Sequence, residues 1–444
     1  MTASISLRSI NKLAIPALIS GVSEPILSLT DAAVVGNIDF NATESLAAVG
    51  IVTTFLSMLI WVLGQTRSAI SSIVSQYVGA NNLESVKNLP AQAIFLITSL
   101  SILIILGTYP FAETIFKLYN ASEVILEYCV DYYRIRVFGF PFTLFVIAVF
   151  GTFRGLQNTY FPMIIALVGT IVNVILDIVL VYGINGFIEP MNIVGAAYAS
   201  IAAQLVMALL AAYLLLTKTS IPLRLTFPFN KEMKKFILMI LNLFVRTIAL
   251  NVTLYYASAF STSYGAEYIA AYTIAINLWF LGAFIIDGYA SAGNILSGKF
   301  LGAKNYMALI ELSQKLIRYG ILVGMTLGVI GALLYYPLGA LFTNDQNVLI
   351  QFYDIFWIVL IMQPLSALAF IFDGIFKGLG KMKYLRNVLL FSTFIIFVPL
   401  VFWFDSSGYK LHGIFIAMTF WIIARGTPLI IKFRQLFLPL AQKG

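Results

Sequence analysis

The residues of this sequence with the clearest chemical potential are carboxylates embedded in apolar segments. The stretch "VSEPILSLTDAAVVG", residues 22–36, places Glu24 and Asp31 seven positions apart. Seven residues span nearly two turns of a helix, so both carboxylates share one face. Apolar surroundings disfavour the charged form of a carboxylate. The pair could therefore bind and release a proton or hold a cation; alternatively, each acid pairs with Arg67 or Arg246 from another apolar segment.

A second pair of oxygen-bearing side chains lies in "GTIVNVILDIVLVYG", residues 169–183. Asn173 and Asp177 are four positions apart and so lie on one helix face. An amide oxygen and a carboxylate together suit a sodium ion or a proton network. Hydrogen bonding between membrane helices is an equally good interpretation of this pair.

The second half of the chain carries further charges in apolar surroundings. Asp373 and Lys377, in "AFIFDGIFKGLG", have the four-residue spacing of a local ion pair, which favours structural pairing. Asp287, in "LGAFIIDGYA", is either an acid of a substrate cavity or a pairing partner. A charge at the bilayer centre costs about 2.5–3.5 kcal/mol on the insertion scale, so these side chains should face the protein interior or a water-filled cavity.

Two prolines accompany the first carboxylates. Pro16 and Pro25 each remove a backbone donor and crowd the preceding turn, which bends a helix. We therefore predict a hinge in this first helix.

The composition identifies the elements that must position these residues. The chain has 444 residues, of which 60% are hydrophobic and 10% charged, against about 25% charged in soluble domains. Twelve apolar segments are long enough to cross a hydrocarbon core of about 30 Å as helices. They lie near residues 13–37, 46–78, 91–117, 130–154, 160–183, 193–217, 235–260, 269–299, 316–341, 352–376, 384–405 and 411–435. The first is too long for the apolar region of a cleavable signal, so we expect a retained span in an all-α polytopic membrane protein.

The distribution of basic residues predicts the topology. With a cytoplasmic amino terminus, only four of the 27 Lys and Arg residues fall on the outer side: Lys117, Arg134, Arg136 and Lys410. Three lie within spans, Arg67, Arg246 and Arg425, which leaves 20 on the inner side. This bias predicts that both termini are cytoplasmic in a multi-pass protein of the plasma (inner) membrane.

The two halves of the chain resemble each other. "YVGANN" at 77–82 aligns with "FLGAKN" at 300–305, and Pro141 aligns with Pro364, in each case 223 positions apart. The repeat predicts two pseudo-symmetric lobes of six helices, at 1–217 and 235–444, joined by a cytoplasmic linker at 218–234. A parallel repeat of this kind is typical of transporters that alternate between two open states, and no filter-like motif of a channel is present.

Several classes of function lack their sequence signatures. The chain has no P-loop, HExxH or GxSxG motif, one histidine and one cysteine, Cys129. We therefore expect the protein to be neither an enzyme nor an ATP-driven pump. We also expect no cofactor, and no metal beyond possible sodium at the site where the carboxylates described above would couple transport to a cation. No basic run suits nucleic acid. The expected partners are the lipid bilayer and a small amphiphilic substrate, and we expect a monomer.

Several motifs together resemble the multidrug and toxic compound extrusion (MATE) family, across essentially the whole chain. "SLTDAAVVGNIDF" is similar to that family's first span, "RSAISSIVSQYVGANN" to its second and "FRGLQNTYFPM" to the end of its fourth. "NVILDIVLVYG" followed by "IVGAAYAS" resembles the fifth and sixth, and "FDGIFKGLGKMKYLRNVL" is especially similar to the DNA-damage-inducible (DinF-type) branch.

The resemblance implies a secondary antiporter that exports organic cations, drugs or other amphiphiles in exchange for protons or sodium. It implies cation coupling at Asp31, Asn173 and Asp177, and a hinge at Pro16 rather than Pro25. A sixth-span threonine of the branch falls near Ser200, which keeps the hydroxyl. Glu24 lies outside the family pattern, and Lys377 replaces an uncharged position. The alternative function is a flippase of the same superfamily for a lipid-linked saccharide.

Overall fold

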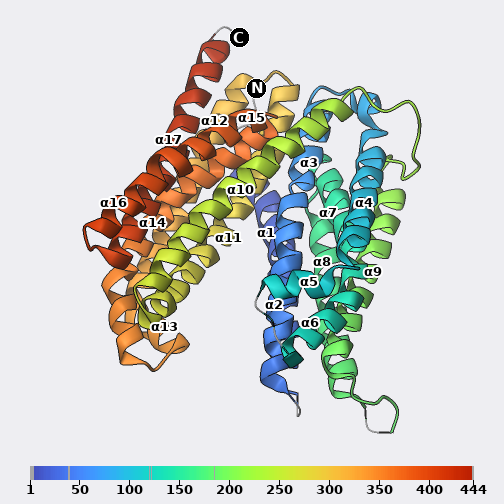
Figure 1. Cartoon of the computed structure of the whole chain (residues 1–444). Helices are drawn as coiled ribbons and strands as arrows, with labels where there is room; N and C mark the ends of the chain where they lie inside the picture. The colour runs from blue at the N-terminus through green and yellow to red at the C-terminus, as the bar shows by residue number, and fades with distance from the viewer. Residues whose placement is uncertain (1–4, 39–40, 120, 122, 185, 443–444) are drawn as a thin grey trace. The chain divides into compact units, whose positions relative to one another are not determined.

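The computed structural model describes residues 5–38, 41–119, 121, 123–184 and 186–442, and most of these residues are helical and none lies in a strand (Figure 1). The helices are α1 (Leu7–Val35), α2 (Ala42–Leu63), α3 (Thr66–Gly79), α4 (Leu89–Thr108), α5 (Ala112–Leu118), α6 (Glu123–Arg136), α7 (Phe140–Gly155), α8 (Tyr160–Tyr182), α9 (Asn192–Lys218), α10 (Met233–Ser263), α11 (Ala266–Gly302), α12 (Tyr306–Leu333), α13 (Tyr335–Phe342), α14 (Gln346–Gly378), α15 (Met382–Phe391), α16 (Val398–Ser406) and α17 (Lys410–Gln442). Short 3₁₀ turns lie at Leu83–Val86 and Val137–Gly139, and a π-helical turn at Ser392–Phe397 joins α15 to α16.

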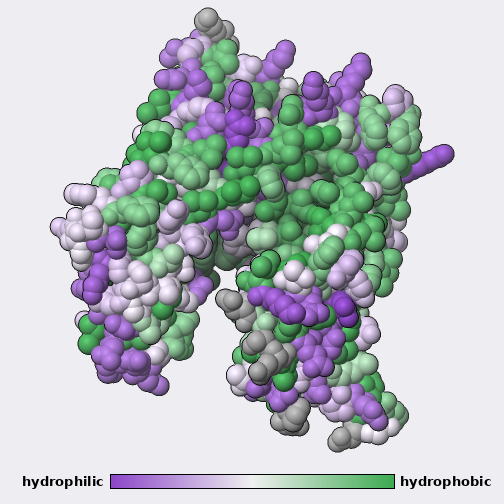
Figure 2. All heavy atoms as spheres, in the orientation of Figure 1, coloured by the Kyte–Doolittle hydropathy of each residue, from purple (hydrophilic) through white to green (hydrophobic). Residues whose placement is uncertain are grey.

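Twelve helical segments in the described part of the chain are long and apolar enough to cross a membrane, which confirms the predicted number. They are Leu7–Val35, Ala42–Gly79, Leu83–Thr108, Val124–Gly155, Tyr160–Tyr182, Asn192–Lys218, Met233–Ser263, Ala266–Gly302, Tyr306–Leu333, Gln346–Gly378, Met382–Ser406 and Lys410–Gln442. Figure 2 shows hydrophobic residues over much of the visible surface and hydrophilic residues gathered toward helix ends, as lipid exposure requires.

The chain divides into two compact units. The amino-terminal unit comprises Ile19–Val74 and Asn82–Phe236; the carboxy-terminal unit comprises the described residues up to Leu18, Ser75–Asn81 and those from Ile237 on. Two short segments of the first half thus belong to the carboxy-terminal unit. The predicted lobe bounds, 1–217 and 235–444 with a linker at 218–234, stay a prediction.

The 223-residue repeat is visible in the bounds of the helices. Four boundaries recur at this separation: the ends of α3 and α11 at Gly79 and Gly302, the starts of α5 and α13 at Ala112 and Tyr335, the starts of α6 and α14 at Glu123 and Gln346, and the ends of α7 and α14 at Gly155 and Gly378. The 223-residue repeat is therefore present in the fold as well as in the sequence, and the two halves, of six spans each, are pseudo-symmetric.

Corresponding glycines create the same helix crossing in each unit. A Cβ on Gly151 of α7 would lie 2.7 Å from the carbonyl oxygen of Arg67 in α3. Its counterpart Gly374 of α14 approaches the carbonyl oxygen of Ala290 in α11, and Ala290 is the repeat mate of Arg67. Small residues let membrane helices approach closely where no aqueous hydrophobic effect drives them together.

A second set of contacts, within the carboxy-terminal unit, has the pattern of a two-fold axis. A Cβ on Gly79 would meet the backbone of Lys299, and a Cβ on Gly302 would meet the backbone of Gln76. These two contacts exchange under the 223-residue shift, as residues around a two-fold axis do. Gly298 approaches the side chain of its own repeat mate, Ser75.

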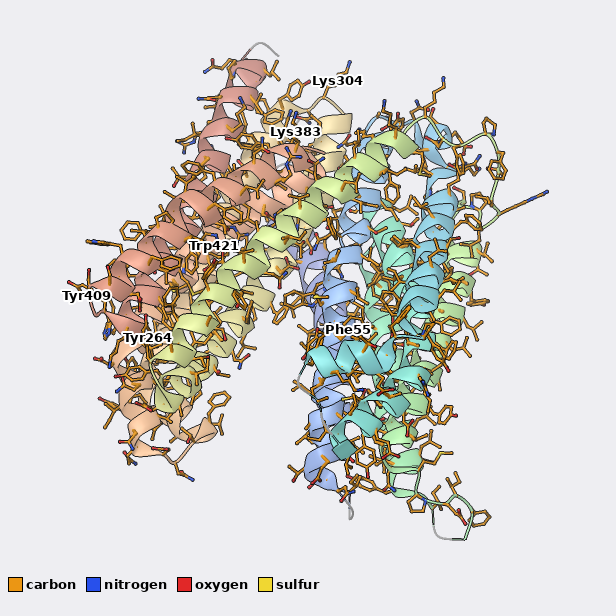
Figure 3. The ribbon with its side chains drawn as sticks, in the orientation of Figure 1. Phe55, Tyr264, Lys304, Lys383, Tyr409 and Trp421 are labelled. Atoms are coloured by element: carbon orange, nitrogen blue, oxygen red, sulfur yellow. The ribbon has the colours of Figure 1, made fainter. Side chains whose placement is uncertain are left out.

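Each unit has its own set of packed helices. In the amino-terminal unit α4, α7 and α9 run side by side, and α8 lies along α9. Phe55, labelled in Figure 3, forms an edge-to-face aromatic cluster with Phe116 and Tyr133 in this unit. In the carboxy-terminal unit α14 is central, packed against α11, α12 and α17.

The connections of the carboxy-terminal unit alternate between its two ends. Lys304, between α11 and α12, and Lys383, in the first turn of α15, lie at one end in Figure 3. Tyr264, between α10 and α11, and Tyr409, between α16 and α17, lie at the other end. This alternation is what successive membrane crossings require.

Candidate functional site

The structure brings together four residues that the sequence singled out, all in the amino-terminal unit. Ser200 Oγ, from α9, donates to Asp31 Oδ2 at 2.8 Å, and Asn173 Nδ2, from α8, donates to Asp31 Oδ1 at 3.3 Å. Asp31, Asn173, Asp177 and Ser200 are each 3% exposed or less. Two helices, α8 and α9, thus converge on one carboxylate of α1.

A fourth donor comes from a residue that the sequence did not single out. Tyr132 of α6 donates its hydroxyl to Asp31 Oδ2 at 3.2 Å, and its ring is fully buried. Hydrogen bonds to a charged acceptor are stronger than neutral ones. Three protein donors therefore stabilise the buried carboxylate of Asp31, and through it they tie α1 to α6, α8 and α9.

Asp177 is in a different situation from Asp31. It is fully buried, and neither of its carboxylate oxygens has a hydrogen-bond partner among the residues that the structure describes. The amide oxygen of Asn173 is buried and unpartnered in the same sense. Buried polar atoms are normally paired. Three unpartnered oxygen atoms beside a second carboxylate fit a site that takes up a proton or a small cation.

The positive neighbour of these acids is Arg136, which the charge count placed on the outer side. The structure instead buries Arg136 at the end of α6, within the fourth candidate span, with 9% exposure. Its Nη1 donates to Gln204 Oε1 at 2.9 Å, and it is a charged neighbour of Asp177. The missed signals are the four-residue spacings of Tyr132 with Arg136 and of Ser200 with Gln204, each of which sets two polar groups on one helix face.

The acid cluster, comprising Asp31, Asp177, Asn173, Ser200, Tyr132 and Arg136, carries unequal charges. Two carboxylates face one guanidinium, and no ion pair to Asp31 is present in the described part of the chain. Burying an uncompensated charge costs several kcal/mol. One added proton or monovalent cation would balance the charges of this cluster.

The predicted ion pair of the second half is present. Lys377 Nζ lies 2.9 Å from Asp373 Oδ2, within α14. Asp373 also pairs with Arg246 of α10, the arginine considered above as a partner for the first-span acids. The pairing of Arg246 within the carboxy-terminal unit leaves Asp31 to its neutral donors.

The remaining predicted residues are not gathered at the acid cluster. Pro16 and Pro25 lie within α1, which is helical across both, so the hinge stays a prediction. Arg67 is half-buried in the first turn of α3, and Asp287 is exposed on α11. The side chain of Glu24 lies outside the described residues.

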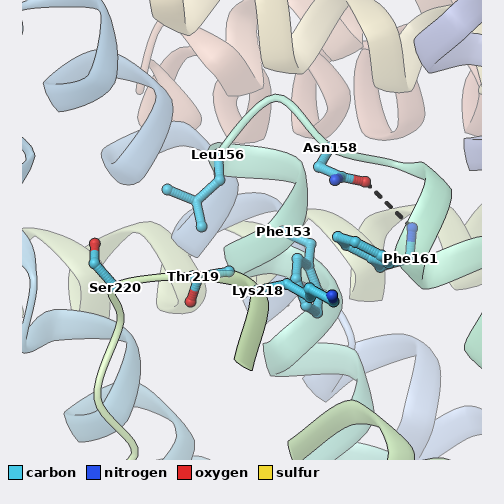
Figure 4. Close-up of a pocket in the computed structure, with 7 residues that line it drawn as sticks. All are labelled: Phe153, Leu156, Asn158, Phe161, Lys218, Thr219 and Ser220. Carbon is cyan, nitrogen blue, oxygen red and sulfur yellow. Dashed lines mark hydrogen bonds between the residues drawn. The ribbon is translucent and has the colours of Figure 1, made fainter. Parts of the chain in front are cut away.

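A separate cavity of about 280 Å³ lies in the amino-terminal unit at the ends of α7 and α9. Its walls include Phe153, Asn158, Phe161 and Lys218, and Asn158 Oδ1 accepts a hydrogen bond from the backbone of Phe161 (Figure 4). No predicted site residue lines it.

The fold and the acid cluster define the class of protein. Twelve membrane-spanning helices in two related sets of six, with buried ionisable groups in the spans, are the features of a secondary transporter. No group of three or more His, Cys, Asp or Glu residues that could hold a metal ion is found within the described ranges.

Comparison with known proteins gives the family. The MatE family model matches residues 16–179 and 239–403, and the chain belongs to this family of transporters, which are not enzymes. "DNA damage-inducible protein F" of Escherichia coli (strain K12) is 25% identical over 95% of this chain and 91% of its own. "Probable multidrug resistance protein NorM" of Photorhabdus laumondii is 26% identical over 92% and 87%. A solved structure, "Crystal structure of MATE in the bent conformation", superposes with a TM-score of 0.90 at 20% identity, covering 98% of this chain and 96% of its own.

Proposed function

We propose that this protein exports organic cations, drugs or other amphiphiles in exchange for protons or sodium ions, which bind at the acid cluster. The observation that carries the proposal is the unbalanced charge of that cluster: two buried carboxylates, one buried arginine and three oxygen atoms without donors. A bound proton or sodium ion supplies the missing positive charge. The names of relatives such as "Probable multidrug resistance protein NorM" support the substrate class.

The hydrogen bonds to Asp31 suggest how cation binding moves the protein. While Asp31 is charged, Tyr132, Asn173 and Ser200 tie α1 to α6, α8 and α9. Neutralising the carboxylate weakens these charge-assisted bonds. The released α1 then bends at Pro16 or Pro25, where the helix already lacks a backbone donor. Substrate loses its site and leaves outward, and cation release toward the cytoplasm restores the first state.

Exchange requires that the two ligands favour different conformations. A ligand shifts a conformational equilibrium only by its difference in affinity for the two states. The proposed cation favours the state with bent α1, and the substrate favours the state in which Asp31 is charged and α1 is held. Competition of this kind couples uptake of one ligand to export of the other.

Topology and assembly complete the proposal. The excess of Lys and Arg in alternate connections supports cytoplasmic termini in a plasma (inner) membrane. Because the acid cluster is built from one chain, a monomer suffices. The flippase alternative is not favoured, since relatives over most of the chain carry multidrug resistance names.

The experiment is export of a fluorescent organic cation from proteoliposomes with proton and sodium gradients imposed independently. We expect one gradient to drive export and Asp31→Asn to abolish it, because an amide binds neither cation in the carboxylate's place. Asp131→Asn is the matched control, since Asp131 is an exposed acid of α6, next to Tyr132. Export by Asp31→Asn at the wild-type rate would refute the proposed mechanism.

A further inference from the structure

Four charged side chains form a second buried cluster, in the carboxy-terminal unit. This cationic cluster comprises Arg246 of α10, Asp373 and Lys377 of α14, and Arg425 of α17. Arg246 and Asp373 are each 7% exposed and Arg425 is 4% exposed. Three helices therefore contribute basic groups to one buried location.

The single acid of this cluster is already fully engaged. Arg246 Nη2 binds Asp373 Oδ1, and Lys377 Nζ binds Asp373 Oδ2 at 2.9 Å. Each oxygen of the carboxylate thus has one cationic partner. Arg425 is a charged neighbour of Asp373 but forms no ion pair with it.

Arg425 is held by aromatic faces instead of acceptors. Its guanidinium carbon lies 4.7 Å from the ring centroid of Trp421 and 5.3 Å from that of Phe370. The indole of Trp421, labelled in Figure 3, donates to Thr393 Oγ1 at 3.1 Å, which fixes its orientation. Aromatic faces attract a cation, but they leave the in-plane N–H donors of the guanidinium free to bind an acceptor.

One of these donors is unused. Arg425 Nη1 is buried and has no hydrogen-bond partner among the residues with described positions. Arginine cannot shed its proton to avoid this situation. A buried, charged and unpartnered donor is an unusual feature that an anionic ligand would resolve.

The charges of the cluster point to the same ligand. Three basic groups face one carboxylate, and Arg246 and Arg425 are close enough to repel each other. Two positive charges therefore exceed the acid in a location that is largely screened from water. Such a charge excess is stabilised by a bound anion and destabilised by a bound cation.

We propose that the cationic cluster is an oxyanion-binding site, in which Arg425 binds a carboxylate or phosphate group beside the rings of Trp421 and Phe370. The planar fork of donors on a guanidinium matches both oxyanions. The inference concerns binding alone and does not depend on the proposed antiport at the acid cluster. It adds an anionic or zwitterionic ligand to the expected organic cations.

The test is equilibrium binding of [¹⁴C]benzoate to the full-length protein in phosphatidylcholine nanodiscs. We expect saturable binding that unlabelled benzoate and inorganic phosphate displace and that benzamide, the neutral analogue, does not. Arg425→Gln should weaken benzoate at least tenfold. Arg318→Gln is the matched control, because Arg318 is an exposed arginine of α12 in the same unit.

Asp373→Asn separates binding from a purely structural role. Removing the competing carboxylate raises the charge excess, so we expect this variant to bind benzoate several-fold more tightly than wild type. A structural role for Asp373 would instead weaken binding. Repeating the titration with phosphatidylglycerol in the nanodiscs identifies the source of the anion. If this lipid weakens benzoate binding to the wild-type protein, and the weakening is lost in Arg425→Gln, the occupant is a lipid phosphate.

The inference fails under defined results. It is overturned if benzoate, phosphate and phosphatidylglycerol all lack binding that depends on Arg425, or if benzamide competes as well as benzoate. It is also overturned if Asp373→Asn weakens the binding of benzoate in correctly folded protein. Proton- or sodium-driven export is measured in a separate experiment, so none of these benzoate results tests the proposed role of the acid cluster.

Discussion

The hydroxyl of Ser200 donates the shortest of the three hydrogen bonds to Asp31. Its removal is therefore the most informative of the three substitutions. A hydrogen bond to a charged group contributes about 1.5–3 kcal/mol, and Asp31 is 2% exposed, so bulk solvent does not reach it to replace the bond. We expect Ser200→Ala to lower the free energy of unfolding by this amount, measured as a decrease in Tm of purified protein. Ser200→Thr keeps the hydroxyl and should retain most of the stability.

The control for this prediction is a serine whose hydroxyl is exposed. Ser407 bonds to the backbone of Trp403 at a helix end open to solvent, so Ser407→Ala should change the free energy of unfolding by less than about 0.5 kcal/mol. Equal effects at Ser200 and Ser407 would mean that the bond to Asp31 carries no special weight.

Residue spacing predicted part of the acid cluster, and physical reasons limited the rest. Asn173 and Asp177 stand out because amides and acids are costly in apolar helices. Tyr132 does not, since tyrosine is common in membrane helices and only its tertiary contact with Asp31 gives it a role. Arg136 was misplaced because it ends α6, where a basic residue could equally lie outside the membrane. The convergence of α1, α6, α8 and α9 is a long-range property that spacing within one helix does not encode.

At the scale of the element, the number of spans was predictable but their ends were not. Apolar length reports the part of a helix within hydrocarbon, whereas the helices continue through flanking polar residues. The predicted segment 316–341 illustrates the difference: the structure has α12 at Tyr306–Leu333 and places the following apolar residues in the separate helix α13. The predicted segment 91–117 likewise includes most of α5.

The first helix offers a test of the proposed hinge. Pro16 lies inside α1 and removes one backbone hydrogen bond there, at a cost of about 3 kcal/mol relative to alanine. We expect Pro16→Ala to raise Tm, because it restores the bond, and to slow export at least tenfold, because the straight helix resists bending. The measurements are Tm in detergent and export from proteoliposomes. Pro25→Ala, tested in parallel, shows which proline is the hinge.

Pro90→Ala is the matched control for the hinge. Pro90 lies in the first turn of α4, where proline is tolerated because the N–H has no partner within the helix. The control should change neither Tm nor export appreciably. Wild-type export by both Pro16→Ala and Pro25→Ala would contradict a proline hinge in α1.

At the scale of the molecule, the duplicated fold carries opposite charges in its two units. The acid cluster of the amino-terminal unit has two carboxylates and one guanidinium, whereas the cationic cluster of the other unit has three basic groups and one carboxylate. The repeat mate of Asp31 is Leu254, and that of Asp177 is Leu400. The repeat thus preserves the backbone packing but not the ionisable groups, which explains why symmetry alone does not predict the sites.

The pseudo-two-fold contacts give the last prediction. Gly302 of α11 and its repeat mate Gly79 of α3 each lie against a backbone that leaves no room for a Cβ. Gly302→Ala should therefore lower the free energy of unfolding by about 1–3 kcal/mol, the usual cost of overpacking, and Gly79→Ala should match it because the contacts are reciprocal. Gly50, in α2, has nothing within 4 Å of an added Cβ, so Gly50→Ala should gain up to about 1 kcal/mol from helix propensity. The measurement is Tm of the three variants in one detergent. Increases in Tm for all three would show that the crossing at Gly79 and Gly302 is loose and that the reciprocal contacts do not constrain the fold.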